Sequence, residues 1–163
     1  MLIRDLKAAD LPAMAEIYND AVVNSTSIWN EALVDVDNRR AFVGMRRELG
    51  FPVIVAEVDG EVAAYATFGD FRAFSGYRFT IEHSIYVDKR FRRRGIARAL
   101  LKSLEAEARL RGKHVMLGGI SADNEASLKL HAELGFREVA RMPEVGRKFD
   151  RWLDLVFMQK ILR

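Results

Sequence analysis

The chain has 163 residues, no cysteine, 26 lysine and arginine residues against 23 aspartate and glutamate residues, and a formal net charge of +3. This length suits a single domain, which we expect to span residues 1–163. The lack of cysteine excludes disulfides and thiolate chemistry by the protein, and fits the reducing cytoplasm, where we expect the protein to work. The charged N-terminus and the absence of a stretch of about 18 apolar residues predict neither a signal peptide nor a membrane span.

The first third of the chain begins with a short apolar segment, residues 2–6, followed by two predicted helices. Asp10 and Pro12 are typical of a helix cap and an early helical proline, and apolar residues then recur at helical spacing as far as Val22. A second helix is predicted over residues 37–49, because Gly50 directly after it favours a left-handed cap.

Three strands are predicted next. Residues 52–58 and 61–68 are rich in strand-forming residues and flank an Asp-Gly pair, which predicts an antiparallel hairpin. Residues 79–87 form a third strand, whose side chains alternate between its two faces. Glu82 and His83 should therefore point to opposite faces, and both can approach one atom only if the strand is bulged.

The second half begins with a basic loop, residues 88–95. A helix is predicted over residues 95–111, with its apolar residues on one stripe and the pairs Glu105–Arg109 and Glu107–Arg111 at i, i+4 spacing on its outer, solvated face. A strand at 114–120 and a helix at 124–134 follow. A final pair of strands completes the chain. The mixed order of elements predicts an α+β layered fold around one sheet.

The basic loop joins a strand to the N-terminus of a helix, and this geometry suits phosphate. The first turn of a helix offers unpaired N–H groups and the positive end of the helix dipole. Gly95 lets the backbone approach a ligand, small Ala97 keeps the next turn clear, and the arginines add charge. Neither the Lys-Ser/Thr pair of a P-loop nor the further glycines of a dinucleotide fold are present. We therefore predict a pyrophosphate on a different kind of cofactor.

The sequence RRRGIA at residues 92–97 matches the R/Q-x-x-G-x-G/A signature of the Gcn5-related N-acetyltransferases (GNAT). NEASLKLHAELGF at residues 124–136 resembles the second acetyl-CoA segment of that family. IYNDAVVNSTSIWNE at residues 17–31 and the strand IEHSIYV resemble its phosphinothricin and methionine sulfoximine acetyltransferase branch. The resemblance, which covers nearly the whole chain, implies a single mixed, mostly antiparallel twisted sheet flanked by helices, with acetyl-CoA at the splay between central strands.

The resemblance also implies direct acetyl transfer from acetyl-CoA to the α-amino group of a small amino acid or analogue. The implied cofactor-binding residues run beside the pantetheine arm and around the pyrophosphate: Ile85, Tyr86, Val87, Arg92, Arg93, Arg94, Gly95, Ile96, Ala97, Arg98, Asn124 and Ser127. The residues implied to border the acceptor are Arg72, Ala73, Phe74, Glu82, His83 and Ser84.

Two residues are predicted to move protons. An aliphatic amine must lose a proton before it attacks a thioester, and Glu82 is the expected base, although an exposed strand glutamate paired with an arginine would look the same. His131 stands where the family usually has a tyrosine that protonates the leaving thiolate, and it shares a helical stripe with Asn124 and Ser127. A structural role for His131 is the alternative, since a thiolate with a pKa near ~8.5 can leave unaided. Three separated histidines and no cysteine predict no metal site.

The segment GDFRAFSGYRF, residues 69–79, mixes four aromatic residues with two arginines. A guanidinium forks well onto a carboxylate, so Arg72 is the expected anchor for an amino-acid acceptor. A hairpin tip or a subunit contact would have the same composition, and we expect a homodimer. Three residues are expected to close the pocket from the other side, with packing the alternative role for the tryptophan: Asn24, Thr26 and Trp29.

Three other functions stay open at this point. A nucleic-acid binder would use the basic loop as a phosphate stripe, but Glu105 and Glu107 balance the charge of the following helix, and we expect neither a nucleic-acid nor a membrane partner. A non-catalytic CoA-binding regulator would keep the phosphate site and lose turnover. An acetyltransferase for protein N-termini, lysines or aminoglycosides would share fold and cofactor, although Arg72 argues against a polycationic acceptor.

Overall fold

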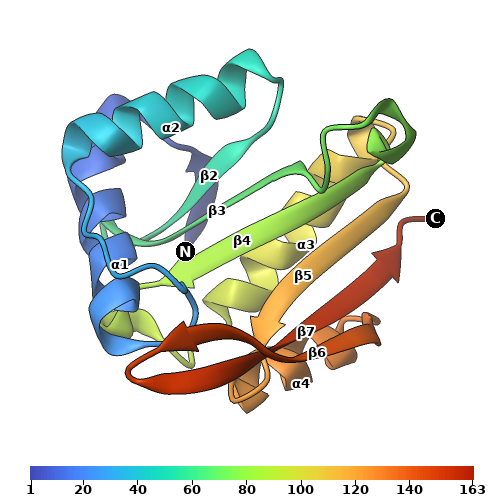
Figure 1. The fold of residues 1–163 in the computed structure, drawn as a ribbon. Coiled ribbons are helices and arrows are strands. Elements are labelled where there is room, and N and C mark those ends of the chain that lie inside the picture. The colour runs from blue at the N-terminus through green and yellow to red at the C-terminus, as the bar shows by residue number, and fades with distance from the viewer.

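The computed structural model describes all of residues 1–163 and shows one seven-stranded twisted sheet with helices on both faces (Figure 1). The strands are β1 (Leu2–Asp5), β2 (Val53–Val58), β3 (Glu61–Asp70), β4 (Thr80–Val87), β5 (Val115–Ser121), β6 (Arg137–Lys148) and β7 (Arg151–Ile161). The helices are α1 (Leu11–Asn24), α2 (Val36–Glu48), α3 (Ile96–Leu110) and α4 (Glu125–Glu133). The spatial order is β1-β2-β3-β4-β5-β7-β6, and only β4 and β5 pair in parallel. The predicted mixed, mostly antiparallel sheet is thus confirmed.

The predicted elements lie within a few residues of those observed, with one local exception at the start of α1. Asp10 precedes this helix, but its carboxylate does not cap it. It accepts a hydrogen bond of 2.7 Å from the backbone of Lys7 and pairs with Arg4 at 2.7 Å. The predicted cap was therefore wrong, because the preceding 3-10 turn and an arginine of β1 take the carboxylate first.

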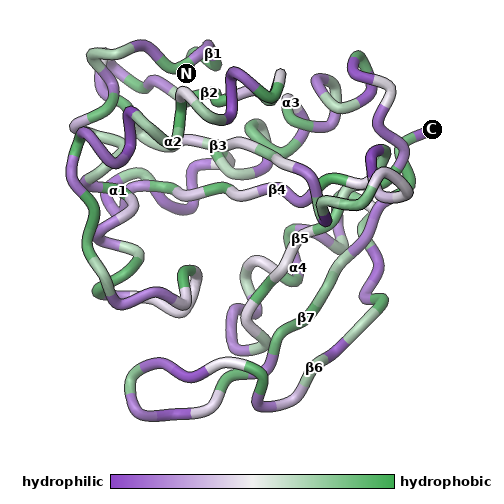
Figure 2. The backbone as a smooth tube through the Cα atoms, turned by 45° about the horizontal axis from the view of Figure 1, so that its top comes forward, coloured by the Kyte–Doolittle hydropathy of each residue, from purple (hydrophilic) through white to green (hydrophobic).

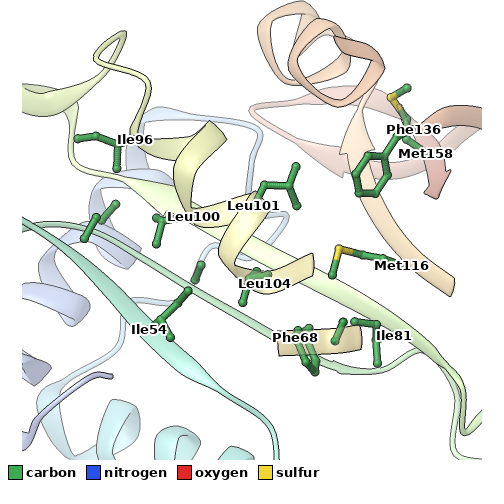
Figure 3. Packing of buried hydrophobic residues seen from close by; sticks show 14 of the residues in the cluster. Ile54, Phe68, Ile81, Ile96, Leu100, Leu101, Leu104, Met116, Phe136 and Met158 are labelled. Carbon is green, nitrogen blue, oxygen red and sulfur yellow. The ribbon is translucent and has the colours of Figure 1, made fainter. Parts of the chain in front are cut away.

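The core lies between the sheet and α3. Leu100, Leu101 and Leu104 of this helix are completely buried, and they pack among apolar residues from the sheet, including Ile81 and Met116 (Figure 3). Burying one leucine side chain stabilises a fold by about 1.5–3 kcal/mol, so this stripe holds α3 firmly against its face. Helices α1 and α2 cover the opposite face through a smaller cluster.

The two central strands, β4 and β5, diverge partway along their length. Strands β4 and β5 pair only over residues 80–82 and 115–117, and then diverge (Figure 1). Beyond that point β4 keeps β3 as its partner and β5 keeps β7. Residues 83–87 of β4 consequently present one edge of free backbone groups to the gap between the strands. An extended ligand can pair with such an edge as an added strand does.

The long β6–β7 hairpin reaches across the open end of this gap (Figure 1). Its tip is mostly hydrophilic (Figure 2), and its turn uses left-handed backbone at Phe149 and Asp150, with φ of 52° and 55°. The hairpin therefore brings residues from the end of the sequence to the region where β4 and β5 diverge.

The helices of this structure are too short or too polar to span a membrane.

Candidate active site

A cavity of about 880 Å³ lies where β4 and β5 diverge. Its walls come from β4, β5, α4, the α1–α2 loop and the tip of the β6–β7 hairpin. The predicted site residues that line it are Glu82, His83, Ser84, Ile85, Tyr86, Val87, Arg92, Ala97, Asn124, Ser127 and His131. Asn24, Thr26 and Trp29 line it from the opposite side, as predicted.

The turn before α3 borders the cavity through Arg92 and Ala97, whereas five other predicted cofactor-binding residues do not line it: Arg93, Arg94, Gly95, Ile96 and Arg98. Gly95 and Arg93 both have left-handed backbone, with φ of 76° and 62°, and the helix begins at Ile96 without a side-chain cap. The first bond of the helix runs from the N–H of Ala99 to the carbonyl of Gly95 at 3.1 Å. No backbone N–H from residues 92–98 donates to a backbone carbonyl. A run of free N–H groups at a helix N-terminus is a binding site for an anion such as phosphate.

Most of the basic side chains in this loop are already paired. Lys89 and Arg92 reach Asp20 at 3.1 and 3.5 Å. Arg90 binds Asp88 and Glu61, and Arg98 binds Glu133. Arg93 and Arg94 form no ion pair, so two guanidinium groups stay available for a bound anion. The free charge of the loop is consequently local, whereas a nucleic-acid binder usually presents a wider basic face.

Glu82 also lines the cavity. Its side chain points toward β5, where one carboxylate oxygen occupies space that a side chain at Gly119 would need. Burial raises the pKa of this carboxyl above its usual value, and the positive charge of Arg46 partly opposes the shift. A glutamate with a raised pKa inside a cavity is a better proton acceptor than an exposed one. The alternation predicted for this strand is confirmed, because Glu82 approaches the Cβ position of Gly119 whereas His83 approaches that of Gly118, on the opposite face of β5.

His83 and His131 form a buried pair with nearly parallel rings. The Nε2 atoms of the two rings are 3.0 Å apart, and Nδ1 of His131 lies 2.7 Å from the carbonyl oxygen of Ser127. A carbonyl only accepts, so Nδ1 of His131 carries the hydrogen, and His83 must donate from its Nε2. Burial lowers the pKa of His83 to about 3 and lowers that of His131 as well, which keeps both rings neutral. Both nitrogens of His131 are therefore engaged by protein groups.

Helix α4 turns its first residues toward the cavity. The Oδ1 atom of Asn124 caps this helix by accepting from the N–H of Ser127 at 3.1 Å. Its amide nitrogen makes no bond within the protein, which leaves two N–H donors for a ligand. The structure thus brings Asn124 and Ser127 to the cavity, as the spacing of the predicted helical stripe suggested.

The predicted acceptor residues on the 71–79 segment lie elsewhere. Arg72, Ala73 and Phe74 are exposed and are not among the residues that line the cavity. The guanidinium of Arg72 stacks over the ring of Phe71 at 5.2 Å, and the Phe74 side chain is 79% exposed. Within a single chain, the structure does not bring these three residues to Glu82.

The sequence analysis missed the contribution of the C-terminal hairpin. Buried Lys148 donates from its Nζ to the carbonyl oxygens of Ser25 at 2.7 Å and Ile28 at 2.6 Å, and so fixes the loop that walls the cavity. The ring of Trp29 fills the space that a side chain at Gly146 would need. No local pattern predicts these contacts, because they join segments about 120 residues apart.

Comparison with known proteins agrees with this geometry. Residues 13–136 match the model of the acetyltransferase (GNAT) family. An L-methionine sulfoximine/L-methionine sulfone acetyltransferase of Salmonella typhimurium is 52% identical over 98% of this chain and 93% of its own length. A phosphinothricin N-acetyltransferase of Alcaligenes faecalis is 35% identical over 98% of this chain and 82% of its own length.

Solved structures are similar to this chain over nearly its whole length. The yncA protein of Salmonella typhimurium, solved with its cofactor acetyl-CoA, has a TM-score of 0.97 and 51% identity, covering 99% of this chain and 94% of its own. A ribosomal-protein-alanine N-acetyltransferase from Brucella melitensis has a TM-score of 0.98 and 52% identity, covering 99% of this chain and 100% of its own.

The splayed sheet, the free N–H groups before α3 and the half-buried glutamate fit a group-transfer enzyme that takes a phosphate-bearing cofactor between two strands. The chain belongs to the acetyltransferase (GNAT) family, as its sequence motifs predicted.

Proposed function

We propose that residues 1–163 act as one domain that transfers the acetyl group of acetyl-CoA to the α-amino group of a small amino acid. Methionine sulfoximine and methionine sulfone are the first candidate acceptors, and phosphinothricin is the second. The observation that carries the proposal is one cavity that extends from Arg92 and Ala97, in the segment with free N–H groups, to the half-buried carboxyl of Glu82. The relatives named for these acceptors support the choice of substrate.

The residues at the phosphate end fit acetyl-CoA. The free N–H groups of residues 93–98 would hold the pyrophosphate, and Arg93 and Arg94 would add charge to it. The free edge of β4 at Ile85, Tyr86 and Val87 would pair with the pantetheine arm, and the amide of Asn124 would donate to the same arm. When bound, acetyl-CoA supplies a thioester whose carbonyl carbon is the electrophile.

Glu82 is proposed to take the proton that the attacking amine must lose, directly or through one water. The amine nitrogen forms a bond to the carbonyl carbon, the carbon–sulfur bond breaks, and the sulfur leaves with the electron pair. The raised pKa of Glu82 favours this step, since it brings the basicity of the carboxylate nearer to that of the amine. Free N–H groups on the β4 edge are the proposed donors to the oxygen that gains negative charge.

His131 as the acid for the leaving sulfur stays a prediction. Its hydrogen bonds weigh against that role, because Nδ1 already donates to Ser127 and Nε2 already accepts from His83. A thiolate whose pKa is near ~8.5 is stable enough to leave without a dedicated donor at neutral pH. We therefore favour a positioning role for the histidine pair beneath the cavity.

Two further predictions remain. One is contact between the acceptor and the residues Arg72, Ala73 and Phe74, and the other is a homodimer. The exposed loop of these three residues carries aromatic and arginine side chains of the kind that are common in interfaces. A second copy packed on this loop is the arrangement in which Arg72 would approach a cavity. Light scattering after a sizing column measures the mass of the protein, and a monomer at assay concentration would contradict the proposed dimer.

We also propose a cytoplasmic location.

The deciding experiment is release of CoA thiol from acetyl-CoA with a panel of acceptors. Methionine sulfone, methionine sulfoximine and phosphinothricin are expected to be acetylated, whereas spermidine and an aminoglycoside are not. A peptide that begins with alanine belongs in the panel, because one similar structure is a ribosomal-protein-alanine N-acetyltransferase. Faster turnover of that peptide than of every free amino acid would replace the proposed substrate class. Acetyl-CoA binding without turnover of any acceptor would indicate a regulator.

A further inference from the structure

Arg46 of α2 lies directly against the sheet beside the proposed base. Its Nη1 atom is only 1.6 Å from the position that a Cβ would take on Gly69 of β3. The guanidinium therefore sits on bare backbone, in space that only glycine leaves open. Its other side is covered by the ring of Phe42, whose centroid is 4.9 Å from the guanidinium carbon. A stacked guanidinium in this position has a fixed plane and a fixed height above the sheet.

This guanidinium has no partner within the protein. Its Nε atom is buried and makes no hydrogen bond, and no ion pair involves Arg46. Burial lowers its pKa, which is the cost of holding a cation away from water, while Asp70 and Glu82 oppose that shift. Asp70 is paired with Lys113 at 3.5 Å. A half-buried cation whose buried Nε atom lacks a partner is expected to receive one from a ligand.

Gly69 and Glu82 are directly opposite each other in the β3–β4 ladder, so Arg46 and Glu82 project from neighbouring points on one face. They do not bond to each other, because the carboxyl of Glu82 points the other way, toward Gly119. One free cation and one carboxylate base thus stand side by side. An α-amino acid carries its amine and its carboxylate on a single carbon, and matches such a pair of charges in sign.

We propose that Arg46 binds the α-carboxylate of the acceptor and thereby places its amine at Glu82. This assignment rests on the proposed amino-acid acceptor. It makes Arg46 the residue that distinguishes amino acids from simple amines, a role that the sequence assigned to Arg72. Neither Arg46 nor Arg72 lines the cavity wall, but Arg46 is half-buried over Gly69, the ladder partner of Glu82, whereas Arg72 is exposed on a loop.

The test compares two acceptors, methionine sulfone and the amine obtained when its carboxyl group is replaced by hydrogen. In Arg46→Gln, kcat/KM for methionine sulfone should fall by about 10- to 100-fold, the loss expected for a charge-assisted hydrogen bond, with most of it in KM. Turnover of the carboxyl-free amine should change by no more than about twofold, since this acceptor never uses the guanidinium. The preference for the amino acid therefore collapses.

Gly69→Ala supplies an independent variant, because its new Cβ displaces the guanidinium while leaving Arg46 in the chain. It should reduce the same preference in the same direction. Arg40→Gln is the matched control, since Arg40 is exposed on the same helix and its ion pair is with Asp37 at 3.7 Å. Arg72→Gln is assayed in parallel, and the melting temperature of each variant is measured.

An equal loss for both acceptors in Arg46→Gln, or no loss, would overturn the assignment, as would collapse of the preference in Arg72→Gln alone. A wild-type enzyme that acetylates no amino acid would overturn the proposed substrate class and the assignment with it. A wild-type enzyme that acetylates methionine sulfone, combined with an unchanged preference in Arg46→Gln and Gly69→Ala, would overturn the assignment only.

Discussion

In the proposed site the backbone N–H groups of residues 92–98 bind the phosphate end of the cofactor, whereas the side chains of Glu82 and Arg46 bind the acceptor. The first end is made by one short turn and the start of one helix. The second requires α2, β3, β4 and β5 to meet. The difference teaches that a cofactor shared by a whole family can be held by local backbone geometry, while the choice of acceptor depends on long-range packing.

The largest effect is expected at the side-chain end. Glu82→Gln should lower kcat by about 100- to 10,000-fold, the usual contribution of a general base, while the Kd for acetyl-CoA stays unchanged. Steady-state kinetics and calorimetric titration measure the two quantities. In the wild type, activity should rise with pH as Glu82 loses its proton, and the midpoint should lie above the usual glutamate pKa of 4.5 because burial raises it.

Glu16→Gln, on the exposed side of α1, is the control for this substitution. Wild-type activity in Glu82→Gln would contradict its role as the base. Loss of acetyl-CoA binding along with turnover would contradict the proposal that Glu82 acts in the transfer step and not in cofactor binding.

A smaller effect is expected from the backbone end. Gly95→Val should raise the KM for acetyl-CoA by about 10- to 100-fold, because a branched side chain resists the φ of 76° and would project over the free N–H groups. The protein itself leaves open space around Gly95, so no internal clash accounts for the loss. Gly112→Val is a matched control, since Gly112 has a φ of 66° and equally open surroundings at the other end of α3. Equal losses in both variants would indicate destabilised backbone and not a lost phosphate site.

The buried histidine pair should make the acceptor end sensitive to acid. Below pH 6.5 the unfolded chain takes up protons on His83 and His131, whereas the folded chain keeps both rings neutral because burial lowers their pKa values. The free energy of unfolding should therefore decrease as the pH falls, by up to about 1.4 kcal/mol per pH unit for each proton. Urea titrations between pH 7 and pH 5 measure the slope, in a range above that in which most carboxylates titrate.

The double variant His83→Met, His131→Met should show a shallower slope over the same range, and His114→Gln, at an exposed histidine, should not. An unchanged slope in the double variant would mean that other groups cause the acid sensitivity.

The smallest effect is expected from the side chain of Arg94, next to the backbone N–H groups proposed to bind the phosphates. Arg94→Gln should raise the KM for acetyl-CoA only a few-fold, because the N–H groups carry most of the binding and an exposed charge contributes about 1 kcal/mol or less. The effect should shrink further at high salt. A rise as large as that in Gly95→Val would show that the arginines, and not the backbone, hold the phosphates.

What the sequence could predict follows the same division. The hairpin around Gly60, helix α3 and the turn at Gly95 are encoded by neighbouring residues, and the structure has them where the sequence predicted them. The contact between Arg46 and Gly69, and the bond between His83 and His131, join elements far apart in the chain. No local period or spacing contains such contacts, since they depend on how α2 and α4 pack on the sheet.

Glu105 illustrates the same limit on a helix whose position was predicted correctly. Its i, i+4 spacing to Arg109 predicts an exposed ion pair, and the pair forms at 3.3 Å. The side chain is nonetheless buried, because Lys160 of β7 reaches it at 2.8 Å. The register of a neighbouring strand decided its burial, and that register cannot be read from the helix alone.

The anchoring of the α1–α2 loop by Lys148 bears on how the protein is completed during synthesis. The ribosome releases the phosphate-binding turn and α4 before it makes the hairpin that carries Lys148. The α1–α2 loop is made early, but the carbonyl groups of Ser25 and Ile28 can bind Lys148 only after the last part of the chain has been made. The cavity wall formed by the α1–α2 loop is therefore complete only after nearly the whole chain has been made.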